Sequence, residues 1–225
     1  MKIAIIGGTG KEGRGLVLRL AAVGEDEVLI GSRQAEKARA KAEELNHQLG
    51  RKAITGLDNR AATHAADLVI LCVPYAAHEE TLRALAPELC GKILVDTTVP
   101  LDPRNPLRLR RRSERSAAEE AQALLGDAVR VVAAFQNVSA AALQNLRRLV
   151  ECDILVCGDD VAAKEVVMAL IRRLGLRALD AGPLEMARAV EAITPLLISL
   201  NRRYRSRSAG IRITGIEEAP APAAE

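Results

Sequence analysis

The chain has 225 residues, of which 49% are hydrophobic and 27% are charged, a composition typical of a globular protein. Its formal net charge is only +3, and it contains no Trp, one Phe and two Tyr, so neither charge nor stacking surface favours a nucleic-acid partner. No apolar run approaches the roughly 18 residues of a membrane-spanning helix, and the short apolar start is no signal peptide, so we expect a cytoplasmic protein.

Short aliphatic runs alternate along the chain with longer stretches of helical periodicity. We expect strands, in chain order, at residues 2–6, 27–30, 68–73, 92–97, 129–134, 154–157 and 177–180. We expect helices at residues 13–23, 35–49, 76–86, 160–174 and 183–203. This alternation predicts an α/β fold in which a mostly parallel sheet carries helices on both faces.

The pattern changes from residue 160 onward, where two helices rich in Ala, Leu, Val and Met dominate. We therefore expect a nucleotide-binding domain at residues 1–150, a small C-terminal α/β subdomain at residues 151–216 and a disordered tail at residues 217–225. The tail contains the sequence EAPAPAAE, which offers few side chains that could pack into a core.

The cysteines show neither CxxC spacing nor nearby histidine partners. We expect all of them to be small buried residues in a reducing compartment: Cys72, Cys90, Cys152 and Cys157. The sequence predicts no metal site.

A glycine-rich turn follows the first expected strand at once and leads into the first expected helix. It fits the pattern G-x-G-x-x-G with the residues Gly8, Thr9, Gly10, Lys11, Glu12 and Gly13. In this pattern the first glycine permits a tight turn, the second lets the backbone approach a pyrophosphate, and the third lets the helix lie close to the strand. The amide groups of the helix N-terminus then face the phosphates. The context predicts a Rossmann-type, doubly wound sheet that binds a dinucleotide.

The end of the second expected strand indicates which dinucleotide is bound. An NAD site normally has Asp or Glu there, to hold the ribose 2′-hydroxyl. This strand instead ends in VLIGSR, so that Ser32 and Arg33 occupy the tip, with Lys37 one turn further along. A hydroxyl and two cations suit a 2′-phosphate, and Thr9 could add a second hydroxyl. We therefore expect NADP as the cofactor.

Several segments of the chain resemble the NADPH-dependent reductases of the deazaflavin coenzyme F420. The resemblance begins with IGGTGKEGRGLVLRLA, GSRQAEKA and SERSAAEEAQALL, and it continues with CDILVCGDD, VVMALIRRLGLRALDAGPL, VEAITPLLISLNRRY and AGIRITGI. It spans about residues 1–216. The later segments are more specific to this family than the glycine pattern, which many families share.

The resemblance implies reversible hydride transfer between C4 of the nicotinamide and C5 of the deazaflavin, in a protein that is commonly a homodimer. It also implies that residues 9–12 contact the pyrophosphate and ribose, and that Ser32, Arg33 and Lys37 hold the 2′-phosphate. The residues it places around the nicotinamide are Val73, Pro74, Ala77, Val99 and Ala140. In the same family Ala209 and Gly210 would close over the site, and Gln136 lies in a segment that faces the deazaflavin. Family members often carry His at position 136 and Pro at position 139.

The sequence suggests no catalytic acid or base. It has three histidines and no Ser–His–Asp, HExxH or paired-carboxylate arrangement. We expect His47, in a polar helix, and His64, in a polar loop, at the surface. For His78 a contact at the nicotinamide edge and a structural role both stay open. Hydride transfer between two flat rings needs the donor and acceptor carbons about 3–3.5 Å apart and little else.

Two basic stretches allow more than one interpretation. The first contains Arg104, Arg108, Arg110, Arg111, Arg112 and Arg115, and the second contains Arg202, Arg203, Arg205 and Arg207. The first could form a basic rim for the phosphodiester and glutamates of F420, or it could be a solvated loop. For the second we favour cations at a helix C-terminus.

Two other functions remain open at this point. One is an NADP-linked reductase of another acceptor, such as a flavin or a small imine or carbonyl compound. For a carbonyl substrate Tyr75 is the only weak candidate for a proton donor. The other is a non-catalytic NADP-sensing module, although such a module would not need the C-terminal segments.

Overall fold

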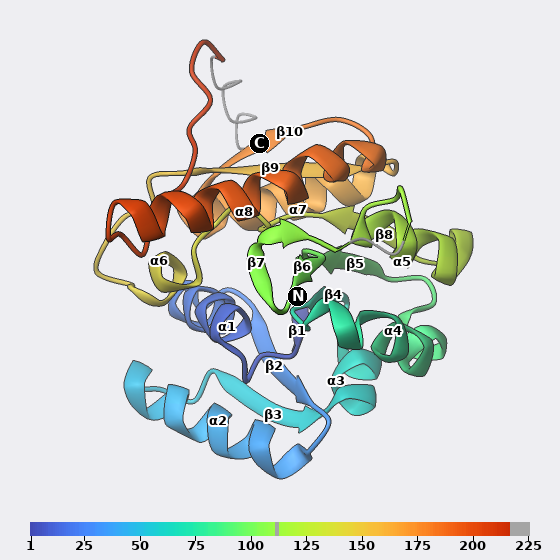
Figure 1. Ribbon diagram of the computed structural model, residues 1–225. Coiled ribbons are helices and arrows are strands. Elements are labelled where there is room, and N and C mark those ends of the chain that lie inside the picture. The colour runs from blue at the N-terminus through green and yellow to red at the C-terminus, as the bar shows by residue number, and fades with distance from the viewer. Residues whose placement is uncertain (111–112, 217–225) are drawn as a thin grey trace, which may run out of the picture.

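The computed structural model describes residues 1–110 and 113–216, so the tail expected at residues 217–225 lies outside the described residues. Eight strands form one sheet in the order β10-β9-β8-β5-β4-β1-β2-β3 (Figure 1). They are β1 (Lys2–Ile6), β2 (Glu27–Ser32), β3 (Ile54–Asp58), β4 (Leu68–Leu71), β5 (Ile93–Asp96), β8 (Arg130–Ala133), β9 (Asp153–Gly158) and β10 (Arg177–Asp180). Neighbouring strands pair in parallel except β8 and β9. The predicted Rossmann-type, mostly parallel sheet is confirmed.

Helices cover both faces of this sheet. They are α1 (Lys11–Val23), α2 (Ala35–Leu49), α3 (Asn59–Ala65), α4 (Tyr75–Leu89), α5 (Ala117–Leu125), α6 (Ala140–Gln144), α7 (Val161–Arg173) and α8 (Ala187–Arg203). Buried residues of α1, α2 and α7 belong to one apolar cluster, and buried residues of α3, α4, α5 and α8 belong to another. The sheet thus has two separate apolar layers, as right-handed parallel crossovers require. No helix in the described ranges is long and apolar enough to cross a membrane.

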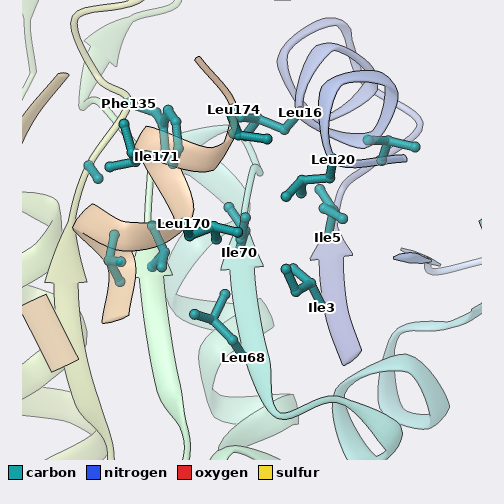
Figure 2. Packing of buried hydrophobic residues seen from close by; sticks show 14 of the residues in the cluster. Ile3, Ile5, Leu16, Leu20, Leu68, Ile70, Phe135, Leu170, Ile171 and Leu174 are labelled. Atoms are coloured by element: carbon teal, nitrogen blue, oxygen red, sulfur yellow. The ribbon is translucent and has the colours of Figure 1, made fainter. Parts of the chain in front are cut away.

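The core is built almost entirely from aliphatic side chains, as the composition requires. Figure 2 shows Leu20 of α1 beside Ile5 of β1 and Leu170 of α7 beside Ile70 of β4. Phe135 has no exposed surface and joins the same layer. With so few aromatic groups, close packing of Ile, Leu, Val and Ala supplies the apolar burial that stabilises the fold.

Several expectations from the sequence are wrong. Strand β3 and helix α3 occupy a segment that we expected to be loop, and His64 lies in the last turn of α3, although it is exposed as expected. The burial of β3 alternates along its length because it is the edge strand, which weakens its apolar signal. Cys90 is exposed at the end of α4, whereas we expected it to be buried.

Three other elements were not expected either, namely α5, α6 and a hairpin formed by β6 (Leu101–Asp102) and β7 (Asn105–Leu109). Helix α5 begins with a capping box in which Ser116 and Glu119 exchange hydrogen bonds, a local signal that the sequence contains. The hairpin carries part of the first basic stretch. Arg104, Arg108 and Arg110 are exposed, and Arg111 and Arg112 lie outside the described residues.

The last described residues bind back onto the sheet. The backbone amide of Asp153 donates to the carbonyl of Ile211, and the Asp153 carboxylate accepts from the amide of Ile213. The Arg177 guanidinium pairs with the same carboxylate at 2.9 Å. Strands β9 and β10 continue the Rossmann sheet, so no break in the sheet marks a boundary at residue 150. The domain division expected there stays a prediction.

The first turn of α1 lies very close to the end of β1. A Cβ atom at Gly13 would stand 2.7 Å from the carbonyl oxygen of Gly7 and 2.7 Å from the Cα atom of Gly8. Both are backbone atoms, which cannot rotate away as a flexible side chain could. Glycine at position 13 therefore allows the helix its close approach.

We expect Gly13→Ala to lower the free energy of unfolding by about 1–3 kcal/mol, because the added methyl group overpacks this contact. Urea unfolding followed by circular dichroism measures the change. Gly10→Ala is the milder comparison, since its Cβ would meet a single atom at 3.2 Å. Wild-type stability for Gly13→Ala would contradict this account of the turn.

Candidate functional site

A cleft lies at the carboxyl ends of the parallel strands, where the chain order reverses on either side of β1. This is the place at which doubly wound sheets bind their ligands. The cleft has a volume of about 470 Å³. It brings together half of the site residues that the sequence predicted: Thr9, Gly10, Ser32, Arg33, Lys37, Val73, Pro74 and Ala77. A wider hollow of about 1020 Å³ lies at the amino ends of β2 and β3 and contains none of them.

The glycine turn leaves the N-terminus of α1 open toward this cleft. Gly10 is the N-cap residue of α1 and provides no side-chain cap, so amide groups of the first turn remain for a bound anion. The left-handed residue in the turn is Gly7, with φ 82°, which precedes the glycine pattern. Gly8, Lys11, Glu12 and Gly13, which the sequence also predicted as site residues, do not line the cleft.

The end of the cleft beside the carboxyl end of β2 is cationic. Arg33 and Lys37 are exposed beside Ser32, and within the described ranges neither cation forms an ion pair. The carboxylate nearest in register is Asp58, which pairs with Ser32 between β2 and β3. Its side chain accepts a hydrogen bond from the amide of Ala61 and so caps α3. These cations are therefore available to an anionic ligand.

A smaller hollow of about 200 Å³ lies beyond β8, and Gln136, Ala140 and Ala209 are among its lining residues. Gln136 is 4% exposed, and its Nε2 donates to the carbonyl of Asp96 at 2.8 Å. In the part of the chain that the structure describes, its Oε1 atom has no hydrogen-bond partner. A buried acceptor without a donor indicates a position where a ligand could donate. Val99 is half-buried and lines neither hollow.

The backbone before Gln136 is strained. Phe135 has φ 73°, a left-handed conformation that is uncommon for a bulky residue. Its ring is fully buried in the core, so packing holds this conformation in place. The turn at Phe135 brings the Gln136 amide back onto the end of β5.

His78 does not lie free at the edge of the cleft. Its ring is 1% exposed, and its Nε2 makes a hydrogen bond of 2.7 Å with Oδ2 of Asp96, which is fully buried. The other oxygen of Asp96 accepts from the amide of Thr98 at 2.9 Å. The structural role of His78 that the sequence left open is therefore the one observed.

Glu12, in the first turn of α1, also responds to the charge of Asp96. Part of the Glu12 side chain or backbone is exposed, but desolvation of its carboxyl group raises the pKa of that group from 4.5 to about 8. The Thr97 hydroxyl lowers this pKa and the charge of Asp96 raises it. Burial likewise raises the pKa of the Cys72 thiol well above its usual value, and the charges of Glu12 and Asp96 raise it further.

We found no paired-carboxylate arrangement in the sequence and so did not identify Glu12 and Asp96 from it. Glu12 lies in the first helix and Asp96 at the end of the fifth strand, so no spacing along the chain relates them. The topology was the available signal, because residues after parallel strands meet at one edge of the sheet. In the described ranges no group of three or more His, Cys, Asp or Glu residues could hold a metal ion.

Tyr75 is held away from any role as a free proton donor. Its hydroxyl donates to the two carboxylate oxygens of Glu120 at 3.1 and 2.9 Å. Glu120 belongs to α5 and also accepts from the hydroxyl of Ser113 at 3.0 Å. The tyrosine therefore joins α4 to α5.

Comparison with known proteins shows likeness over nearly the whole chain. Residues 2–100 match the family model of coenzyme F420-dependent NADP oxidoreductases. The chain is 48% identical to an F420-dependent NADP reductase of Methanocaldococcus jannaschii, over 96% of this chain and 100% of that protein. It is 47% identical to one of Methanothermobacter thermautotrophicus, over 97% of each. The crystal structure of a candidate F420-dependent NADP-reductase from Arthrobacter sp. FB24 superposes with a TM-score of 0.81, at 28% identity, covering 95% of this chain and 99% of the other.

Glu12 should make stability depend on pH. Because its pKa is higher in the folded protein, its stabilising contribution is full below about pH 4.5 and is lost as the pH rises to about 8. Glu12→Gln cannot titrate. We therefore expect the free energy of unfolding of the variant to exceed that of the wild type increasingly across this window, by about 1–3 kcal/mol above pH 8.

Urea unfolding at about pH 5 and about pH 9 measures this difference. Glu80→Gln is the matched control, since Glu80 lines the same cleft but is exposed. We expect its effect to be the same at both pH values. A pH-independent effect of Glu12→Gln would show that the carboxyl group is ordinary.

Proposed function

The chain belongs to the family of coenzyme F420-dependent NADP oxidoreductases, and we propose that it transfers a hydride reversibly between NADP(H) and coenzyme F420. The single observation that supports NADP most directly is the cationic end of the cleft. Ser32, Arg33 and Lys37 line it together, no carboxylate stands at the tip of β2, and Asp58 is used as a helix cap. This arrangement suits a 2′-phosphate and leaves a bare 2′-hydroxyl without its usual acceptor.

NADP fits the residues that are present. Arg33 and Lys37 would neutralise the 2′-phosphate, and the amides at the uncapped start of α1 would bind the pyrophosphate. Val73, Pro74 and Ala77 would line the nicotinamide end with apolar surface, which excludes water. When bound, the nicotinamide and the deazaflavin themselves supply the hydride chemistry. The chain binds them, orients them and keeps water out.

The hollow beyond β8 would receive the deazaflavin. Gln136 presents a buried oxygen that has no donor among the described residues, and a ring N–H of the acceptor could supply one. Thr194 holds this segment, because its hydroxyl donates to the Gln136 carbonyl at 2.8 Å. Ala209 lines the same hollow, and its amide donates to the side chain of Asn201 at 3.0 Å. Val99 and Ala140 stay predicted contacts of the nicotinamide.

We further propose that the protein is a cytoplasmic homodimer. Leu196 is 56% exposed and Met186 is 43% exposed on and just before α8, which gives a second copy an apolar surface to cover. The exposed arginines of the hairpin, Arg104 and Arg108, would attract the anionic tail of F420.

The alternative acceptors have less support. A carbonyl reductase needs a proton donor at its substrate, and the Tyr75 hydroxyl is bound to Glu120. A sensor that used only the Rossmann half would not need the hollow beyond β8, to which Thr194 and Ala209 of the C-terminal part contribute. An F420-linked hydride transfer uses both hollows.

We expect Arg33→Asp to raise the dissociation constant for NADPH on the order of 100-fold, because it removes a charge-assisted contact and adds repulsion. The dissociation constant for NADH should change less than about threefold. Isothermal titration calorimetry measures both. Arg39→Asp, which reverses an exposed charge on α2, is the control and should leave both affinities near wild type. Equal losses for NADPH and NADH with Arg33→Asp would refute the 2′-phosphate site.

We expect the purified protein, mixed with NADPH and F420, to bleach the visible absorbance of the deazaflavin. A stopped-flow or plate absorbance assay records this change, with NADH as the control donor. Reduction of flavin analogues while F420 stays oxidised would instead favour another acceptor. The presence of Gln136, where family members often carry His, would then be the first difference to test.

A further inference from the structure

The short helix α6 contacts both of the places that the proposed reaction uses. At its N-terminal end, Ser139 and Ala140 line the hollow beyond β8. At its C-terminal end, Gln144 reaches the first turn of α1. Figure 1 shows α6 beside α1. The functions described above give α6 no part beyond the contact predicted for Ala140.

One hydrogen bond joins the end of α6 to the start of α1. The Nε2 atom of Gln144 donates to the backbone carbonyl of Lys11 at 2.7 Å. Lys11 is the first residue of α1, and the amide groups of this turn are those assigned to the pyrophosphate. Gln144 itself is partly exposed and lines neither the cleft nor the hollow. A shift of α6 along α1 would break this bond.

Close packing holds α6 in place on α1. A Cβ atom at Gly15 would stand 2.7 Å from the Cβ atom of Leu143, which is fully buried. The Arg19 guanidinium of α1 donates to three backbone carbonyls at the end of α6 and after it, at 3.0, 3.1 and 3.3 Å, namely those of Ala142, Asn145 and Arg148. Contacts this close give the two helices one relative position.

The other end of α6 is fixed to the C-terminal part of the chain. Ser139 is the N-cap residue, and its hydroxyl oxygen accepts from the amides of Ala141 and Ala142. The same hydroxyl donates to the carbonyl of Arg207. Ala209 follows two residues later and lines the hollow. Helix α6 therefore runs from the turn assigned to the pyrophosphate to the wall of the hollow assigned to the acceptor.

The rate of hydride transfer depends on the distance between the two rings. The donor and acceptor carbons must come about 3–3.5 Å apart, and a misplacement of about 1 Å can lower the rate about 100-fold. The start of α1 would fix one ring through the pyrophosphate, and the hollow beyond β8 would hold the other. An element that touches both places can therefore control this distance without contacting either ring.

We propose that α6 sets the distance between the nicotinamide and the deazaflavin, and that Gln144 is a positioning residue that acts through the Lys11 carbonyl. The proposal rests on the proposed function, because it requires the dinucleotide at the start of α1 and the deazaflavin in the hollow. The reaction is the one already proposed. The C4–H bond of NADPH breaks, its hydrogen and electron pair form a C–H bond at C5 of the deazaflavin, and the reduced ring takes up one proton from solvent.

The test is single-turnover hydride transfer, recorded by stopped-flow absorbance of the deazaflavin with enzyme in excess and NADPH saturating. Gln144→Met keeps the length of the side chain and removes the donor without adding charge. We expect it to lower the rate constant of transfer about tenfold, because the two rings lose their alignment. The dissociation constants for NADPH and F420, measured by calorimetry, should change less than about threefold, and the melting temperature should stay near that of the wild type.

Two further readouts separate positioning from a merely structural role. Gln144→Lys can still donate to the Lys11 carbonyl, so it should restore most of the rate. NADPH deuterated at C4 should slow Gln144→Met at least as much as it slows the wild type, because the impaired step is the transfer itself.

Gln48→Met is the matched control. The Oε1 atom of Gln48, on α2, accepts from the Arg14 guanidinium at 3.2 Å, so this change also removes a glutamine contact with α1, but one that does not involve α6. We expect the wild-type rate. Gly15→Ala tests the proposal independently, since its methyl group would press on Leu143. It should lower the rate while both ligands still bind, and if one of the two α6 variants fails to fold, the other decides.

The proposal is overturned if Gln144→Met transfers the hydride at the wild-type rate, or if Gln144→Lys is as slow as Gln144→Met. It is also overturned if the rate falls only in proportion to weaker binding of NADPH or F420, which would make Gln144 a structural contact. A failure of the proposed function is a different result, since the wild type itself would then not reduce F420 with NADPH.

Discussion

The close contact between the start of α1 and the end of β1 is the constraint on which the other features of the site depend. Gly13 has no side chain, and any Cβ there would collide with the backbone of the preceding turn. This contact points the uncapped amides of α1 into the cleft. Glu12 lies in the same first turn of α1, where burial, together with the charge of Asp96, raises the pKa of its carboxyl group to about 8. One packing contact thus underlies both the uncapped start of α1 and the desolvated carboxyl group of Glu12.

Exposed and buried charges differ in this part of the molecule. At one end of the cleft Arg33 and Lys37 are exposed and can pair with a ligand that brings its own negative charge. Asp96, by contrast, is fully buried, and desolvation of the Glu12 carboxyl group raises its pKa to about 8. Exposed charges attract and discriminate between ligands, whereas buried ones respond to a change of charge nearby.

The half of the sheet beyond β5 carries the smaller hollow, which is formed by loop and C-terminal residues as well as by helices. The left-handed backbone at Phe135 is held by a fully buried ring, and it directs Gln136 onto the end of β5. The C-terminal segment then returns along β9 and is tied there by Asp153 and Arg177. These contacts hold Ala209 at the hollow, so residues far apart in the chain share one small surface.

The sequence by itself determined the parts of this protein that depend on local patterns. The glycine turn, the alternation of strands and helices, and Ser32 with Arg33 at the tip of β2 are all contiguous in the chain, so their chemistry can be read from neighbouring residues. The edge strand β3 and the short helices α3 and α6 were missed because their apolar signal is brief or alternates with exposed positions. Only the tertiary structure decided that the charge of Asp96 acts on Glu12, that His78 binds Asp96, and that Gly7 makes the left-handed turn. The physical reason is that burial and charge act through space, and the distance between two carboxyl groups is set by the packing of the whole sheet.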